Sequence, residues 1–221
     1  MYQLVFDFGA VLFEWQPAQL AAESFPDLAS TPDAAAQLGQ EIFGHADWLA
    51  FDRGRLTLDA VVGSTAQRLA LPQARLHSLI SGIGEGLRPI EATVGLLAEL
   101  ASRRRQHGDL RLYYLSNMPA LYARALERKH SFVGWFDGGI FSGDVQCCKP
   151  DAAIYQLLQS RYALDPARTW LFDDSRDNVA AARGFGWNGF QFISPQQLRF
   201  SLGDLLGQEE LRAPVLSQGI G

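Results

Sequence analysis

The feature that most constrains the fold is an alternation of short apolar runs with amphipathic segments, interrupted once near the start. The first run, residues 2–8, is rich in β-forming side chains and ends at Gly9, as a buried strand does. Residues 14–86 then show helical spacing without a convincing strand, and strands and helices alternate after Pro89. The sequence therefore predicts an α/β fold: a Rossmann-like parallel sheet core wound on both faces, with a helical cap inserted after the first strand.

The same pattern divides the chain into parts. Residues 1–13 and 87–206 are expected to form the core, residues 14–86 the cap, and residues 207–221 a loosely ordered tail, with the polar, glycine-containing character of that tail beginning at Gly203. The predicted helices of the cap span 32–48, 58–69 and 72–80. In the core we expect helices at 90–105, 121–129, 151–161 and 178–183 and further strands at 110–115, 139–141, 169–172 and 189–192.

Composition excludes several classes of partner. The 221 residues carry 19 basic and 24 acidic side chains, a net charge of −5, with no basic block of the kind that binds DNA or RNA. No apolar run reaches the ~18 residues of a membrane span. The two cysteines, Cys147 and Cys148, are adjacent and fit neither a disulfide framework nor a zinc site. With no leader resembling a signal peptide, we expect a cytoplasmic protein with no nucleic-acid or membrane partner.

Reactive polar residues follow the predicted strands at their carboxyl ends. The parallel arrangement brings these ends to one edge of the sheet, which is where ligands bind in such folds. Lysine is rare in this chain, since 17 of its 19 basic residues are arginine. A lysine among the polar residues that follow the strands is therefore notable. The residues are Asp7, Ser116, Asn117, Lys149, Asp173 and Asp174.

Carboxylates dominate this set. Asp7, Asp173 and Asp174, with Asp177 one turn later, would repel one another strongly unless a cation lay among them. Oxygen ligands in this number suit Mg²⁺, which completes its shell with waters and substrate phosphate oxygens. Lys149 would then neutralise negative charge beside the phosphoryl group. The pattern therefore predicts a Mg²⁺ site that receives a phosphate.

Four segments together resemble those of the haloacid dehalogenase-like hydrolases, specifically capped subfamily I. They are Phe6 to Leu12 (FDFGAVL), Leu115 to Asn117 (LSN), Lys149 to Asp151 (KPD) and Leu171 to Asp174 (LFDD). Their order, with a helical insert between the first two, makes the resemblance specific over nearly the whole chain. Bacterial α-glucose-1-phosphate phosphatases and the phosphatase domain of soluble epoxide hydrolases are similar members.

The resemblance implies a Mg²⁺-dependent phosphatase with an aspartyl-phosphate intermediate. Its substrate would be a small phosphorylated metabolite such as a sugar phosphate, and the oligomeric state is left open. Asp7 would be the nucleophile, with Ser116 and Lys149 also catalytic. The implied phosphate-binding residues are Ser116, Asn117 and Lys149, and the implied metal ligands are Asp7, the Gly9 carbonyl, Asp173 and Asp174, with Asp177 in a supporting position.

One position departs from the family pattern. Most phosphatases of this kind carry a second aspartate two residues after the nucleophile, as the acid and base of the reaction, whereas this chain has Gly9. Loss of such a group costs about 10²- to 10⁴-fold in rate. Three interpretations follow: a substrate with a good leaving group, such as a sugar 1-phosphate, which we prefer; substitution by Glu14; or weak catalysis.

Two other functions are compatible with parts of the pattern. A 2-haloacid dehalogenase uses the same aspartate without Mg²⁺, but the acidic pair Asp173 and Asp174 argues against it. A non-catalytic protein of this fold would bind a phosphorylated ligand or a partner protein. Substituting Asp7 distinguishes the second alternative from an enzyme.

Overall fold

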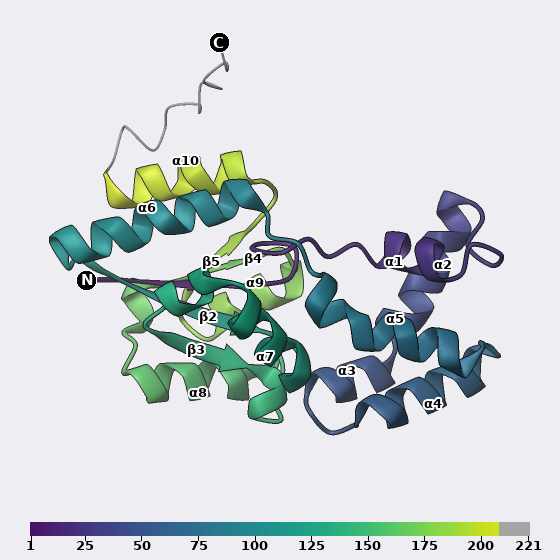
Figure 1. The fold of residues 1–221 in the computed structure, drawn as a ribbon. Coiled ribbons are helices and arrows are strands. Elements are labelled where there is room, and N and C mark those ends of the chain that lie inside the picture. The colour runs from purple at the N-terminus through teal and green to yellow at the C-terminus, as the bar shows by residue number, and fades with distance from the viewer. Residues whose placement is uncertain (208–221) are drawn as a thin grey trace, which may run out of the picture.

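Five parallel strands form a single sheet in the computed structural model, which describes residues 1–207 (Figure 1). The strand order is β3-β2-β1-β4-β5, so the chain moves outward from β1 in one direction and then in the other. The predicted α/β class and parallel sheet are confirmed. The strands are β1 (Tyr2–Phe6), β2 (Leu110–Ser116), β3 (Gly138–Phe141), β4 (Thr169–Asp173) and β5 (Asn188–Gln191).

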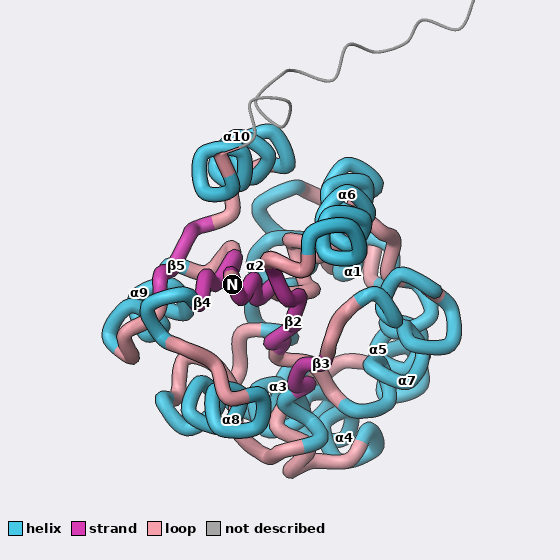
Figure 2. Tube along the Cα trace, turned by 90° about the vertical axis from the view of Figure 1, so that its left-hand side faces the viewer, coloured by secondary structure: helices cyan, strands magenta, loops and turns pink. Residues whose placement is uncertain are grey.

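Each face of the sheet is covered by its own set of helices (Figure 2). Successive side chains of a strand point to opposite faces, so Leu4 and Phe6 of β1 join one apolar cluster and Val5 joins the other. Helices α6 and α10 contribute to the first cluster, and α8 and α9 to the second. The core helices are α6 (Glu91–His107), α7 (Ala120–Lys129), α8 (Ala152–Tyr162), α9 (Arg176–Gly184) and α10 (Pro195–Leu206), with short 3₁₀ turns η1 (Ser131–Trp135), η2 (Ser142–Asp144) and η3 (Pro166–Arg168).

A helical unit follows β1 and lies beyond the carboxyl ends of the strands, at the right of Figure 1. Its helices all fall within residues 14–86, the segment predicted as the cap, and we call this unit the cap. It is held together by apolar side chains of every helix, such as Ile42, Val62 and Ile80. The helices are α1 (Pro17–Ser24), α2 (Pro32–Phe43), α3 (Ala46–Asp52), α4 (Leu58–Leu69) and α5 (Gln73–Gly86).

The two linkers between core and cap run side by side. The amide of Glu14 donates to the carbonyl of Arg88 at 2.8 Å, and the amide of Ile90 donates to the carbonyl of Leu12 at 2.8 Å. An antiparallel bridge between Phe13 and Pro89 lies between these bonds. The two chain connections between cap and sheet therefore form one paired ribbon.

The structure corrects two predicted elements. The single helix predicted at 32–48 is two helices, because α2 ends at Phe43 and His45 caps α3 by accepting a hydrogen bond from the amide of Asp47. The tail predicted from Gly203 onward begins later, because α10 continues to Leu206 and Gly207 ends it with a left-handed φ of 63°. The rest of the predicted tail, residues 208–221, lies outside the described residues.

Helix α10 itself was not predicted, although its signals are present. The Ser194 hydroxyl accepts a hydrogen bond from the amide of Gln197, and Pro195 occupies the first turn. In the described part of the chain, no helix combines the length and apolar character needed to cross a membrane.

Candidate active site

Asp7 and Asp173 meet because their strands are neighbours in register. Phe6 of β1 lies opposite Phe172 of β4, so Asp7, which follows β1, and Asp173, the last residue of β4, lie at the same edge of the sheet. The Asp7 amide still donates to the Phe172 carbonyl at 3.0 Å, and its own carboxylate accepts from the Phe8 amide at 2.7 Å. Both carboxyls therefore sit at the point where the strand order reverses, the usual ligand site of such a sheet.

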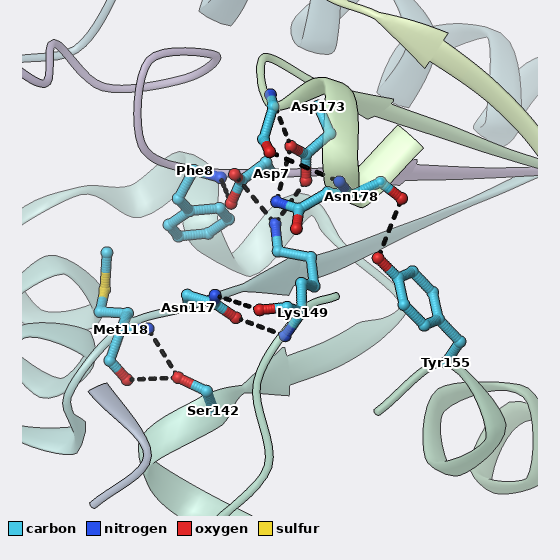
Figure 3. Close-up of polar contacts among 10 residues, drawn as sticks. Asp7, Phe8, Asn117, Met118, Ser142, Lys149, Tyr155, Asp173 and Asn178 are labelled. Carbon is cyan, nitrogen blue, oxygen red and sulfur yellow. Dashed lines mark hydrogen bonds and ion pairs between the residues drawn. The ribbon is translucent and has the colours of Figure 1, made fainter. Parts of the chain in front are cut away.

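Lys149 is buried between these two carboxylates (Figure 3). Its Nζ lies 2.6 Å from Asp173 Oδ2 and 2.9 Å from Asp7 Oδ2, and only 1% of the residue is exposed. The backbone of Lys149 is fixed by Asn117, whose amide nitrogen donates to the Lys149 carbonyl at 2.9 Å and whose oxygen accepts from the Lys149 amide at 2.8 Å. The Asn117 side chain thus positions the lysine.

Asp173 is saturated by donors of the protein. Its Oδ2 accepts from Lys149, and its Oδ1 accepts from the amide of Ser175 at 3.0 Å and from Asn178 Nδ2 at 2.9 Å. Tyr155 fixes the last of these by donating to the carbonyl of Asn178 at 3.0 Å. Asp173 is completely buried behind the site, where its contacts orient the lysine.

Three carboxylates form the acidic cluster of the site. One oxygen from each of Asp7, Asp173 and Asp174 lies within 4.8 Å of the others. Burial raises the pKa of Asp7, and the charges of Asp173 and Asp174 raise it further, against the opposing effect of Lys149. Burial likewise raises the pKa of Asp174, followed by the charge of Asp173. A single ammonium does not balance three carboxylates, so the cluster suits an additional hard cation such as Mg²⁺.

Two carboxyls of the cluster, those of Asp7 and Asp174, line a cavity of about 250 Å³. The core contributes all but one of the cavity's polar side chains, together with Met118 and Pro119, whereas the linker and the cap contribute mainly apolar side chains. From the core come Asp7, Gly9, Ser116, Asn117, Met118, Pro119, Tyr122 and Asp174. From the linker, the cap and its end come Trp15, Phe43, Trp48, Asp52, Ile83 and Leu87.

The aromatic side chains of the cap pack against one another around this cavity. The ring centroids of Trp15 and Phe43 lie 5.3 Å apart, and those of the stacked rings of Trp15 and Trp48 lie 6.2 Å apart. Phe43 packs edge to face on Trp48, with ring centroids 4.7 Å apart. Helix packing explains part of this contact, but all three residues also line the cavity. Together they form an apolar wall of the cavity.

The predicted site residues fall into two groups. Asp7, Asp173, Asp174, Lys149, Ser116, Asn117 and Gly9 gather at one edge of the sheet. Asp177 is exposed on the first turn of α9, outside the acidic cluster. Glu14 is exposed and lines a different cavity, of about 280 Å³, together with Gln16 and Gln19. The structure therefore does not bring Glu14 to Asp7 as a replacement acid.

The sequence analysis did not identify one of the carboxyl groups that line the cavity. Asp52 ends α3, is 9% exposed and lines the cavity with Asp7, 45 positions away in the chain. A signal existed in the sequence, because Asp52 follows Phe51 and lies one helical turn from Trp48, on the apolar side of its helix. A carboxyl on an apolar helix face needs a partner or a function.

No protein-family model matches the chain. Among curated proteins, it is 26% identical to the sesquiterpene phosphatase astK of Aspergillus oryzae over 203 residues, which cover 92% of this chain and 95% of that protein. It is 27% identical over 204 residues to the drimenol cyclase drtB of Aspergillus calidoustus, of whose length the match covers only 36%.

Solved structures of two kinds share the architecture. HAD family enzyme bt-2542 of Bacteroides thetaiotaomicron, solved with magnesium and inorganic phosphate, superposes with a TM-score of 0.66 at 16% identity, covering 87% of this chain and 94% of that one. The L-2-haloacid dehalogenase of Xanthobacter autotrophicus superposes with a TM-score of 0.63 at 20% identity, covering 97% and 85% of the two chains. The resemblance predicted from four short segments is confirmed: the fold of this chain is that of the haloacid dehalogenase-like hydrolases.

Proposed function

We propose that the protein is a Mg²⁺-dependent phosphomonoester hydrolase that forms an aspartyl-phosphate on Asp7. The observation that carries the proposal is the convergence of Asp7, Asp174 and Ser116 on one cavity, with Lys149 buried against Asp7 at 2.9 Å. Similarity to a phosphatase over 92% of the chain supports the same reaction.

The first half of the reaction needs a nucleophile and charge stabilisation. An oxygen of Asp7 attacks phosphorus, and the bond to the leaving oxygen breaks with its electron pair moving to that oxygen. Lys149 holds Asp7 in place and offsets the charge of the phosphoryl oxygens, and the Ser116 hydroxyl donates a hydrogen bond to them. The Asn117 side chain is already bonded to Lys149, so its contribution to the phosphate is through its backbone.

Water then attacks the aspartyl-phosphate and releases Asp7 and inorganic phosphate. Asp7, the Gly9 carbonyl and Asp174 line the cavity and would hold Mg²⁺, while Asp173 supports them from behind. When bound there, Mg²⁺ would supply positive charge that offsets the charge of the phosphate oxygens.

The wall of the cavity favours a substrate with an apolar organic group. A sugar would place hydroxyls against Trp15, Phe43 and Trp48, which leave most of those hydroxyls without hydrogen-bond partners. An isoprenoid or aromatic group instead buries apolar area against the same wall. The sesquiterpene named for the curated relative is of this kind. We therefore place an apolar phosphate monoester before the sugar phosphate expected from the sequence.

Phosphate release in Mg²⁺ buffer tests the proposal. The substrates to compare are farnesyl phosphate, 4-nitrophenyl phosphate, glucose 1-phosphate and glucose 6-phosphate, each with and without EDTA. We expect the highest kcat/KM on farnesyl phosphate and loss of activity in EDTA. Asp7→Asn should lower kcat by about 10³-fold or more, since it removes the nucleophile, whereas Asp33→Asn, an exposed change on α2, should not.

The alternatives give different results in the same assay. Halide release from 2-chloropropionate in EDTA, without phosphate release from any ester, would make the protein a dehalogenase. Full activity in Asp7→Asn would contradict the proposed nucleophile. Phosphate-ester binding without turnover in wild type would indicate the non-catalytic alternative.

A further inference from the structure

The cavity holds one carboxyl that the proposed reaction does not use. In the described part of the chain, the carboxyl groups that line the cavity are those of Asp7, Asp174 and Asp52. The proposed reaction uses Asp7 for attack and Asp174 for metal binding. The leaving oxygen still needs a proton, and Gly9 has no side chain to supply one. Asp52 is therefore the group whose role is open.

The position of Asp52 relative to the reaction follows from the in-line geometry of phosphoryl transfer. The leaving oxygen lies on the far side of phosphorus from the attacking Asp7. Asp7 lines the cavity from the core, and the organic group of the substrate would lie among Trp15, Phe43 and Trp48. The leaving oxygen would then lie between the phosphorus at Asp7 and these aromatic side chains. Asp52, on cap helix α3, borders the same space.

The end of α3 is fixed to the core, so Asp52 is held in place. The Ser142 hydroxyl, which is completely buried, donates to the Asp52 carbonyl at 2.6 Å and accepts from the Met118 amide at 2.8 Å. Directly after Asp52, Arg53 forms an ion pair with Asp151 of the core at 2.7 Å.

Gly54 completes this attachment. It has a left-handed φ of 69°, and a Cβ at this position would lie 2.5 Å from the Gly143 carbonyl, so only glycine allows the approach. Arg55 then donates to the Gln146 carbonyl at 3.2 Å. These contacts of consecutive residues position the carboxyl of Asp52 through the backbone.

The surroundings of Asp52 favour its protonated form. No described cation forms an ion pair with its carboxyl, and its neighbours are Trp48, Tyr122, Cys148 and Asp7. Burial, then the charge of Asp7, raises the pKa of Asp52 to about 8, against the Trp48 indole, which favours the charged form. A buried carboxylic acid of this kind is a suitable proton donor near neutral pH.

We propose that Asp52 is a further catalytic residue, a cap-borne acid and base that replaces the carboxyl missing at Gly9. The inference rests on the proposed phosphatase function. As the bond between phosphorus and the leaving oxygen breaks, that oxygen takes the electron pair and the proton of Asp52. The resulting carboxylate then accepts a proton from the water that attacks the aspartyl-phosphate, while the bond from phosphorus to Asp7 breaks.

Leaving-group dependence tests this role. The probes are 2-phenylethyl phosphate, whose alkoxide is a poor leaving group, and 4-nitrophenyl phosphate, whose phenolate leaves without a proton. Asp52→Asn should lower the first-turnover rate on the alkyl ester by about 10²- to 10⁴-fold and on the aryl ester by less than tenfold. Because water attack also loses its base, the variant should release a burst of nitrophenolate equal to the enzyme concentration.

The control is Asp47→Asn, a change on the same helix at a carboxyl that does not line the cavity. It should leave both rates within about twofold of wild type. Equal losses on both esters in Asp52→Asn, or no loss on either, would overturn the role of Asp52. Absence of phosphatase activity in wild type would instead refute the proposed function.

A second measurement uses wild type alone and does not depend on the folding of a variant. Rates of the first chemical step are compared across aryl phosphates of increasing phenol pKa. A general acid makes these rates nearly independent of the phenol, and we expect this flat dependence. A steep decline with rising phenol pKa would show that no acid protonates the leaving oxygen and would overturn the inference.

Discussion

At the scale of single residues, the site is organised by one buried lysine. Lys149 contacts a carboxylate that faces the cavity, Asp7, and one that does not, Asp173. Burial acts to lower the pKa of Lys149, but the two carboxylates outweigh burial and raise it above its usual range. The lysine therefore stays charged.

Removing this charge should destabilise the protein as well as inactivate it. Lys149→Met leaves Asp7 and Asp173 buried without their counter-ion, and loss of one partner of a buried pair costs about 3–5 kcal/mol. Urea denaturation measures the free energy of unfolding. The control is Lys129→Met, which changes the other lysine of the chain, on the exposed side of α7. Equal stability of the two variants would contradict this account of Lys149.

Residue-scale prediction from the sequence succeeded where chemistry depends on strand ends. Parallel strands bring Asp7, Ser116 and Asp173 to one edge whatever the loops do. It failed for Asp52, because the position of α3 depends on tertiary contacts such as the bond from Ser142, 90 positions away in the chain. Glu14 is adjacent to the cavity-lining Trp15 but faces another cavity, so proximity in sequence was a poor guide.

At the scale of elements, the contact between α3 and η2 decides how the cap meets the core. Ser142 begins η2 and bonds both to the Asp52 carbonyl and to the Met118 amide after β2. One hydroxyl thus links cap helix, sheet edge and 3₁₀ turn. Helix periodicity located most cap helices in the sequence, but it carries no information about such a link.

Ser142→Ala should therefore weaken both stability and catalysis. An unsatisfied buried backbone group costs about 1–3 kcal/mol, which urea denaturation would detect. The rate on 2-phenylethyl phosphate should fall more than the rate on 4-nitrophenyl phosphate, because Asp52 loses its fixed position. Ser78→Ala, an exposed serine on α5, is the matched control and should change neither quantity appreciably.

A second element contact predicts a pH dependence. Arg103 of α6 donates to Asp109, just ahead of β2: its Nε and Nη2 lie 3.0 and 2.6 Å from Oδ2, and its Nε also lies 3.3 Å from Oδ1. The Arg103 hydrogen bonds hold the pKa of Asp109 below its usual range. A lowered pKa means that the pair stabilises the fold above the ordinary aspartate pKa and loses this effect as the pH falls through the folded value.

Asp109→Asn should lower the free energy of unfolding at pH 7 by about 0.5–1 kcal/mol, because the pair is partly solvent-exposed. The difference from wild type should shrink below about pH 4, where the carboxylate is protonated in the unfolded chain and then in the folded one. Urea denaturation at several pH values checks this. A difference that grew on acidification would contradict the sign of the effect.

At the scale of the whole molecule, the topology separates two tasks. The core supplies the acidic cluster and the lysine beside the reversal of strand order, and the linker and cap supply the apolar wall. The strand and helix alternation was sufficient to predict the sheet, because periodicity is a local property. The cavity between core and cap was not predictable in this way, because it depends on how the surfaces of two distant chain segments meet.

Metal binding should stabilise the whole fold. A ligand that binds only the native state adds about 2.7 kcal/mol at 100 times its Kd, so thermal unfolding should shift upward with increasing MgCl₂. Asp174→Asn should remove most of this shift, whereas Asp177→Asn, an exposed change outside the acidic cluster, should retain it. An unchanged shift in Asp174→Asn would contradict the proposed ligand set.

The paired linkers between core and cap make the position of Asp52 relative to Asp7 depend on whether the cap is closed over the sheet. The bonds from Glu14 to Arg88 and from Ile90 to Leu12 tie both linkers into one ribbon, about which the cap would swing as a unit once the contacts of Ser142 and Asp151 with the end of α3 broke. Such a swing carries Asp52 away with it but leaves Asp7 and Lys149 in the core. Asp7 would then remain in the reaction centre whether the cap is open or closed, whereas Asp52 would be present only when the cap is closed. An ester too short to reach the apolar wall would therefore lack a proton donor.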